Sequence, residues 1–140
     1  MNITFFKYQG TGNDFVIINA FDSKELELEI DQIQKICNRK YGVGSDGLIL
    51  IKKSIKQEFK MDFYNPDGSQ SFCGNGARCA VHFAFTSNII KDNSCFFEAA
   101  DGVHKAYICE GEVKIEMSKI GVIQQLGSIK DEVNQGKSFF

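Results

Sequence analysis

Residues 72–86 read Phe-Cys-Gly-Asn-Gly-Ala-Arg-Cys-Ala-Val-His-Phe-Ala-Phe-Thr and carry the clearest information about the fold. From 77 to 85 the apolar residues cover most of the circumference of a helix, a pattern typical of a helix that is buried on nearly all sides. Its polar row, Arg78, His82 and Thr86, has a spacing of four residues, so we expect one exposed seam. The stretch therefore predicts a central helix around which a sheet curls.

Cys73 stands at the start of this helix, directly before Gly74, with Gly76 two residues further on. Unsatisfied N–H groups and the positive end of the helix dipole favour a thiolate there, and the same N–H groups can hold a carboxylate. A thiolate base beside a bound carboxylate suits proton abstraction from the α-carbon of an amino acid. The motif alone leaves a second interpretation open, a buried structural cysteine before a glycine turn, because cysteine is among the most buried residue types.

Strand patterns surround this helix in the sequence. The expected strands are apolar or alternating runs at 3–8, 14–19, 48–51, 59–64, 95–99, 103–109 and 113–117, with a return strand through Ser71 and Phe72. The first two form a hairpin with a loop at 9–13, and a second helix is expected over 30–41 with Gly42 as its stop. Many strands, short turns and two helices predict an α+β class with a mainly antiparallel or mixed sheet rolled around a central buried helix.

Length, composition and charge limit the number of domains and the kinds of molecule that the chain could bind. The 140 residues are 43% hydrophobic, enough for one domain with its own core. The net charge is −2 and Lys and Arg are spread singly, so we expect no nucleic-acid partner. There is no signal-peptide pattern, and no apolar run approaches the roughly 20 residues that span a bilayer, so we expect no membrane partner and a cytoplasmic location. Reduced thiols are expected for the five irregularly spaced cysteines, Cys37, Cys73, Cys79, Cys95 and Cys109.

Two motifs suggest nucleotide or metal binding, but their context or spacing does not fit these functions. Residues 42–47 match the G-x-G-x-x-G dinucleotide fingerprint, but here a helix is expected before the motif and a strand after it, which reverses the required order. Cys73, Cys79 and His82 could suggest a metal site. Six residues of helix rise about 9 Å, which is too far for one compact tetrahedral site, so we expect no metal.

Four segments carry a family resemblance. They are Lys-Tyr-Gln-Gly-Thr-Gly-Asn-Asp-Phe-Val at 7–16, Arg-Lys-Tyr-Gly-Val-Gly-Ser-Asp-Gly-Leu at 39–48, Phe-Tyr-Asn-Pro-Asp-Gly-Ser at 63–69 and Cys-Gly-Asn-Gly-Ala-Arg-Cys at 73–79. In content, order and spacing they resemble the amino-terminal half of the diaminopimelate epimerases. This family interconverts LL- and meso-diaminopimelate, a precursor of lysine and peptidoglycan, without pyridoxal phosphate, so the resemblance implies no cofactor.

The resemblance also implies a mechanism and a set of site residues. Members have two similar lobes, each a sheet rolled around a helix, and one cysteine from each lobe faces the substrate in the cleft between them. By position, Cys73 is the acid/base of this lobe. Gly74 and Asn75 are implied to hold the α-carboxylate and amine of the reacting centre, and Asn13 and Asn65 to bind polar ends of the substrate. For these last two residues, turn-forming asparagine is the alternative.

The resemblance further predicts how the chain is divided. Residues 1–118 form the epimerase-like lobe, and 119–140 form an inter-lobe linker and the start of a second lobe, with Phe139 and Phe140 at its entry. The second cysteine motif of the family is not present, so we expect a half-enzyme that is inactive alone. Its expected partner is a second copy in a homodimer or a complementing carboxy-terminal half. The alternatives are a lobe of a proline or hydroxyproline racemase and a non-catalytic thiol or metal-binding module.

Overall fold

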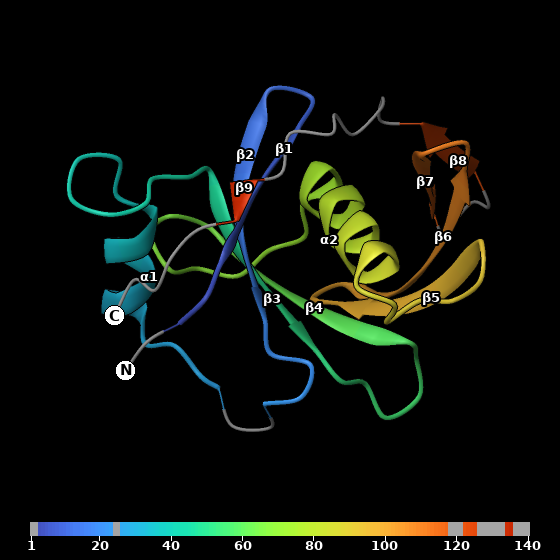
Figure 1. Ribbon diagram of the computed structural model, residues 1–140, viewed down its shortest axis with the longest axis horizontal. Helices are drawn as coiled ribbons and strands as arrows, with labels where there is room; N and C mark the ends of the chain where they lie inside the picture. The colour runs from blue at the N-terminus through green and yellow to red at the C-terminus, as the bar shows by residue number, and fades with distance from the viewer. Residues whose placement is uncertain (1–2, 24–25, 118–121, 126–133, 136–140) are drawn as a thin grey trace.

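A computed structural model describes residues 3–23, 26–117, 122–125 and 134–135 (Figure 1). The described residues form one mixed sheet in the order β8-β7-β6-β5-β4-β3-β2-β1-β9, together with two helices. The β2–β3 and β4–β5 pairs are parallel and the other pairs are antiparallel, so the predicted α+β class is confirmed. The elements are β1 (Phe6–Gly10), β2 (Asn13–Asn19), α1 (Ile30–Cys37), β3 (Gly47–Lys52), β4 (Phe59–Tyr64), α2 (Gly74–Thr86), β5 (Ser94–Ala99), β6 (Gly102–Cys109), β7 (Glu112–Met117), β8 (Val122–Gln125) and β9 (Asn134–Gln135).

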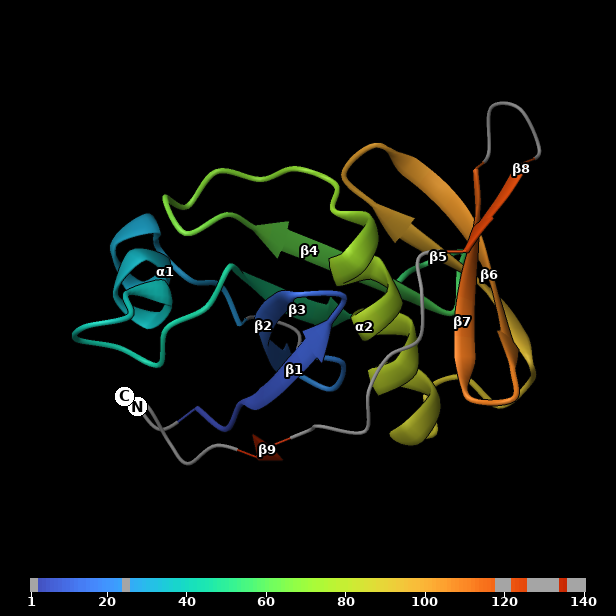
Figure 2. The same ribbon diagram turned by 90° about the horizontal axis from the view of Figure 1, so that it is seen from above.

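Helix α2 lies inside the curve of the sheet, between β1 and β7 (Figure 2). Its buried apolar side chains pack in one core with those of β1 to β7. They are at most 2% exposed and point to all sides of the helix: Ala77, Cys79, Ala80, Val81, Phe83 and Ala84. The predicted central buried helix is therefore confirmed.

Helix α1 covers the opposite face of the sheet. It buries Ile33, Ile36 and Cys37 against alternate residues of β2 and β3, including Val16 and Leu48. Because each of these two strands is covered on both faces, their sequences are nearly continuous apolar runs. The sheet thus separates a small core under α1 from a larger core around α2 (Figure 1).

The predicted exposed seam on α2 is wrong at Arg78. Thr86 is exposed and His82 is half-buried, but Arg78 is 0% exposed. The turn between β1 and β2 lies over the start of α2, and the Arg78 guanidinium donates to the hydroxyl of Thr11 in that turn. The burial of Arg78 is therefore a consequence of tertiary contacts, which helical spacing does not reveal.

Helix α1 is shorter than the predicted 30–41 and ends at Cys37. The side-chain oxygen of Asn38 accepts the backbone N–H groups two and three residues later, at 2.8 and 2.9 Å. This local turn competes with continuation of the helix. Gly42 is not the predicted helix stop but allows a close approach, because a Cβ atom there would lie 1.8 Å from the carbonyl oxygen of Lys35.

The remaining predictions for the sheet have mixed outcomes. Strands predicted at 48–51, 59–64, 95–99, 103–109 and 113–117 are confirmed. The first hairpin is also confirmed, although its turn is only Thr11 and Gly12, both with positive φ. The return strand through Ser71 and Phe72 is wrong: one isolated bridge joins Tyr64 to Gln70, and the chain then leaves the sheet for α2.

Part of the predicted division of the chain lies outside the described residues. This applies to its boundary at 118–119 and to Phe139 and Phe140. Within the described ranges, β8 extends the sheet beyond β7 and β9 pairs with β1. No helix in these ranges has the length and apolar character needed to cross a bilayer.

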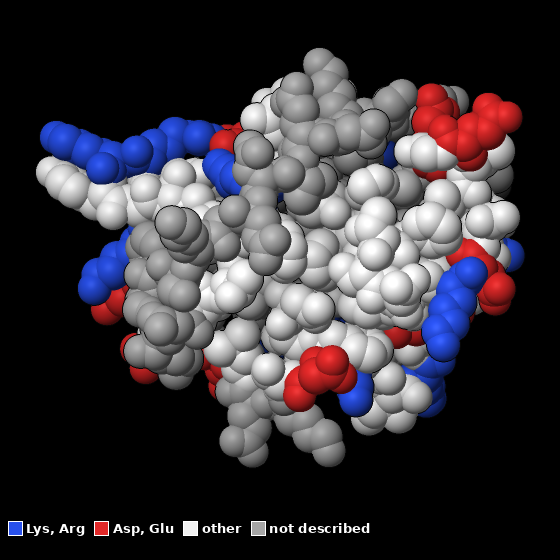
Figure 3. Space-filling model, viewed as in Figure 1, with Lys and Arg blue, Asp and Glu red and all other residues white. Residues whose placement is uncertain are grey.

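The charges of the molecule nearly balance. On the face shown in Figure 3, Lys and Arg as well as Asp and Glu lie mainly around the margin, and uncharged side chains occupy the middle. The formal net charge is −2. Electrostatic arguments about this molecule therefore depend on local contacts.

Candidate active site

Cys73 is the N-cap residue of α2, as predicted from the sequence. Its backbone is extended, with φ −127° and ψ 118°, and its carbonyl oxygen accepts the N–H of Ala77 at 2.8 Å. Its Sγ atom accepts the N–H of Gly76 at 3.4 Å, while the side chain stays half-buried. The N–H groups of Gly74 and Asn75 also belong to the first helical turn, where N–H groups have no partner within the helix. A thiol and anion-binding donors therefore lie side by side.

Two glycines allow this helix start to pack tightly. A Cβ atom on Gly76 would lie 3.3 Å from the Phe63 ring and 3.4 Å from the Ile49 side chain, so the first turn rests directly on the sheet. A Cβ atom on Gly10 would lie 3.1 Å from the Sγ atom of Cys79. The β1–β2 hairpin and α2 are thus in close contact, and this contact places the hairpin beside the first two turns of the helix.

Asn13 and Asn75, two of the predicted substrate-binding residues, are brought together. The amide nitrogen of Asn75 donates to the amide oxygen of Asn13 at 2.8 Å. Asn13 begins β2 and Asn75 lies in the first turn of α2, next to Gly74 and Cys73. Four of the five predicted site residues therefore gather at the start of α2.

Asn65, the fifth predicted site residue, makes its contacts elsewhere. Its amide nitrogen donates to the carbonyl and hydroxyl oxygens of Ser69, both at 3.2 Å, and to the hydroxyl of Ser71 at 3.1 Å. These bonds close the turn that follows β4, as the turn-forming alternative predicts. A substrate-binding role for Asn65 stays a prediction.

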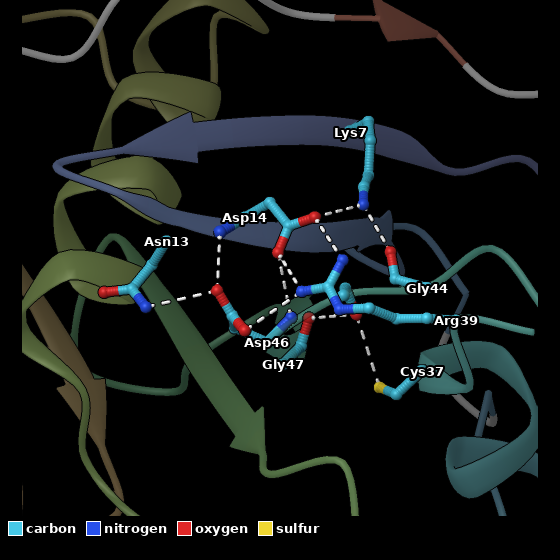
Figure 4. Close-up of polar contacts among 9 residues, drawn as sticks. Lys7, Asn13, Asp14, Cys37, Arg39, Gly44, Asp46 and Gly47 are labelled. Atoms are coloured by element: carbon cyan, nitrogen blue, oxygen red, sulfur yellow. Dashed lines mark hydrogen bonds and ion pairs between the residues drawn. The ribbon is translucent and has the colours of Figure 1, made fainter.

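A charged cluster beside Asn13 was missed by the sequence analysis (Figure 4). Asp14 accepts from Lys7 at 2.6 Å and from Arg39 at 2.7 Å, and Arg39 also donates to Asp46 at 3.0 Å. The hydrogen bonds from Arg39, followed by those from Lys7, hold the pKa of Asp14 well below its usual range. The signal was present in two glycine-bearing segments, since Asp14 near the start of β2 and Asp46 directly before β3 each precede a run of buried residues. The parallel β2–β3 pairing brings those two turns together.

The other four thiols differ from Cys73 in their surroundings. Cys37 is buried at the end of α1, and Cys109 is exposed beside the β6–β7 turn. Burial raises the pKa of Cys79 and of Cys95 to about 12. Cys73 therefore combines partial access with a helix N-terminus. Among the described residues, no group of three or more His, Cys, Asp or Glu side chains could hold a metal ion.

Comparison with known proteins identifies a family over most of the chain. A family model described as "Diaminopimelate epimerase" matches residues 5–124. A diaminopimelate epimerase from Flavobacterium psychrophilum is 48% identical over 113 residues, which cover 77% of this chain and 42% of the relative. One from Campylobacter jejuni is 44% identical over 121 residues, which cover 86% and 47%. The chain thus spans about half the length of these curated relatives, and the matches confirm the predicted family resemblance.

Solved structures extend the likeness to the fold. A hydroxyproline epimerase from Agrobacterium vitis, solved with bound trans-4-hydroxy-L-proline, aligns with a TM-score of 0.63 at 12% sequence identity. The alignment covers 84% of this chain and 43% of that structure. At such low identity the likeness concerns the fold alone, so it does not favour the racemase alternative over the family that the sequence comparisons identify.

Proposed function

The chain belongs to the diaminopimelate epimerase family, and we propose that it supplies one lobe of an enzyme that interconverts LL- and meso-diaminopimelate. One observation carries this proposal: Cys73 is the N-cap of the central buried helix, with Asn75 and Asn13 hydrogen bonded beside it. That arrangement combines a proton-transfer group with donors for an amino acid at one place in the lobe.

In the proposed reaction, Cys73 exchanges a proton with the α-carbon. In one direction the thiolate takes the α-proton, so that the C–H bond breaks, an S–H bond forms and the electron pair is delocalised into the α-carboxylate. The N–H groups of Gly74 and Asn75 hold that carboxylate, and the positive end of the α2 dipole stabilises its growing charge. A second acid then delivers a proton to the opposite face, which inverts the centre. In the reverse direction Cys73 returns the proton as a thiol.

The second acid requires a second lobe. Cys79 is fully buried six residues into α2, Cys37 lies under the other face of the sheet, and Cys95 is buried on β5. Cys109 is exposed, but it ends β6 rather than beginning a helix. None of these thiols has the setting of Cys73, so we propose that the opposing cysteine belongs to a carboxy-terminal half, with residues 119–140 as the connection. These 140 residues alone would then not invert the substrate.

Self-association offers a weaker route to a second base. A lobe that closes against a similar lobe would leave its cleft face uncovered, so we propose that the isolated chain dimerises. A twofold dimer could bring two Cys73 residues together, but it would lack the substrate contacts of a true second lobe. Misplacement by about 1 Å can cost a hundredfold in rate. Light scattering that shows a monomer at high protein concentration would contradict the dimer.

Solvent-deuterium incorporation at the α-carbon of diaminopimelate, followed by NMR, tests the proposed function. The chain would be measured alone, and then mixed with the carboxy-terminal part of the Flavobacterium psychrophilum relative that it does not cover. We expect inversion with deuterium incorporation in the mixture and none from either part alone. Proline and hydroxyproline serve as alternative substrates and should not react.

Two results would contradict the proposal. Inversion of diaminopimelate by the 140-residue chain alone would show that no second lobe is needed. A mixture that forms a stable complex but incorporates no deuterium into diaminopimelate would reject the assigned reaction.

A further inference from the structure

A continuous chain of hydrogen bonds crosses the candidate site from one arginine to another. Arg78 donates to the amide oxygen of Asn75 at 3.3 Å, and Asn75 donates to the amide oxygen of Asn13 at 2.8 Å. Asn13 in turn donates to Asp46 at 3.1 Å, and Asp46 accepts from Arg39 at 3.0 Å. The three steps from Arg78 to Asp46 run in the same donor-to-acceptor direction, and Arg39 donates to Asp46 from the other end.

The charged ends of this chain determine how the two amides are turned. A carboxylate can only accept, so Asp46 requires the NH2 group of Asn13, which turns the oxygen of Asn13 toward Asn75. A guanidinium can only donate, so Arg78 requires the oxygen of Asn75, which turns its NH2 group toward Asn13. If either amide were rotated by 180°, it would face a donor with a donor at one contact and an acceptor with an acceptor at the other. The orientation is therefore imposed from both ends.

Asp46 is itself held firmly at its place in the fold. The same carboxylate oxygen that accepts from Asn13 also accepts the backbone N–H of Asp14 at 3.1 Å. In return, the backbone N–H of Asp46 donates to the carbonyl oxygen of Asp14 at 2.9 Å. These reciprocal bonds join the start of β2 to the residue directly before β3, with Arg39 bridging both carboxylates (Figure 4).

The amides remain open to a ligand. Each NH2 group has two hydrogens and uses one in the chain of hydrogen bonds, so among the described residues Asn13 and Asn75 each keep one N–H for another acceptor. A pocket of about 390 Å³ opens beside Asn13, and Asp46 and Arg39 also line it. The two asparagines can therefore donate hydrogen bonds to a molecule bound in the site.

We propose that Asp46 and Arg78 are positioning residues, which fix the donor orientation of Asn13 and Asn75 toward the polar groups of the substrate. This inference rests on the proposed function for the identity of the substrate. The orientation of the amides does not depend on that identity and can be measured in the ligand-free chain. Asp46 suits mutagenesis better than the buried Arg78, because its side chain is 40% exposed.

The first test uses the side-chain amide resonances of Asn13 and Asn75 in the NMR spectrum of the full chain. Asp46→Ala removes the acceptor, so both resonance pairs should shift, although Asn13 is the only one of the two amides that Asp46 contacts. In an Asn13→Ala background, Asp46→Ala should leave the Asn75 resonances unchanged, because the intermediate amide is gone. Asp22→Ala is the matched control, since Asp22 is an exposed carboxylate in a distant ion pair with Lys53.

A conservative variant separates hydrogen bonding from charge. Asp46→Asn keeps an oxygen that can accept from Asn13 but loses the charge that pairs with Arg39. We expect Asp46→Asn to restore most of the Asn75 resonance pattern. In the complex with a carboxy-terminal half, Asp46→Ala should raise the KM for diaminopimelate about tenfold with a smaller change in kcat, and Asp46→Asn should recover much of that loss.

The outcomes distinguish this inference from the proposed function. If Asp46→Ala folds and leaves the Asn75 resonances unchanged, the positioning role is overturned. Equal shifts of these resonances in Asp22→Ala would also overturn it. If Asp46→Ala does not fold, Asp46→Asn and Asn13→Ala provide the same comparison, and unchanged Asn75 resonances in Asn13→Ala would overturn it too. If the resonances shift as expected but the wild-type complex incorporates no deuterium into diaminopimelate, the positioning role is supported and the assigned substrate is rejected.

Discussion

The two helices each carry a cysteine at one end, but at opposite ends. Cys37 is the last residue of α1, and Cys73 is the N-cap of α2. Burial raises the pKa of Cys37, and its Sγ atom lies 3.4 Å from the hydroxyl of Ser45. Cys73 is half-buried at the positive end of its helix, with an N–H group directed at its sulfur. The same residue type is thus placed for packing in one helix and, under the proposed function, for proton transfer in the other.

This difference follows from where each helix lies. Helix α1 covers an outer face of the sheet and buries one side, so its ends are free to serve as connections. Helix α2 is enclosed by the sheet along its middle, while Gly74 and Asn75 at its start are half-buried and Thr86 at its end is exposed. Of the two ends, the N-terminal one carries the backbone N–H groups that have no partner within the helix.

The largest expected effect concerns the two thiols. In the complex with a carboxy-terminal half, Cys73→Ala should slow deuterium incorporation at the α-carbon by at least about a hundredfold, because a proton-transfer group contributes that much or more. Cys37→Ala is the matched control and should leave the rate close to unchanged. Similar rates for the two variants would remove the distinction between the helices.

A second prediction compares the burial of the helices. Phe83 on α2 is 2% exposed and its ring lies 5.0 Å from that of Phe6, so Phe83→Ala should lower the free energy of unfolding by about 3–5 kcal/mol. Ile30 on α1 is 57% exposed, and Ile30→Ala should change it by no more than about 0.5 kcal/mol. Urea unfolding of both variants measures the difference. A small loss for Phe83→Ala would mean that α2 is not the centre of the core.

A third prediction concerns the segment after α1, where Arg39 binds Asp14. Asp14→Asn should lower the free energy of unfolding by about 2 kcal/mol at pH 7, because charged hydrogen bonds from Arg39 and Lys7 are lost. The folded-state pKa of Asp14 is depressed, so this stabilisation is present above its unfolded value of about 4 and is lost as the pH falls further. Urea unfolding at several pH values checks this. A difference between the two proteins that stays constant down to pH 2 would contradict it.

Most of the fold was predictable because local patterns and burial agree. The all-round apolar character of α2, its start at Cys73 and the strands from Leu48 to Met117 all follow from periodicity and turn residues. The errors occur where specific side-chain contacts determine the end of a helix or the burial of a residue. Asn38 ends α1 through its own hydrogen bonds, and Arg78 is buried under a hairpin that is distant in sequence.

The candidate site was predictable in part for the same reason. Cys73 follows from its place before a helix, whereas the pairing of Asn13 with Asn75 depends on contact between a hairpin and a helix 62 residues apart. The cluster around Asp14 and Asp46 required the parallel pairing of β2 with β3, which the sequence analysis did not predict. Asn65 shows the opposite case, since turn chemistry alone explains its contacts.

The most direct test of the account is the rate of alkylation of each cysteine as a function of pH. The protein would be treated with iodoacetamide, and each modified site would be quantified by mass spectrometry. We predict that Cys73 reacts faster than Cys37, Cys79 and Cys95, because its side chain is half-buried, whereas burial shields these three thiols and raises their pKa values. Exposed Cys109 provides the reference for access without a helix N-terminus. Equal rates for Cys73 and Cys37 across the pH range would contradict the claim that Cys73, at the start of α2, is the thiol placed to react.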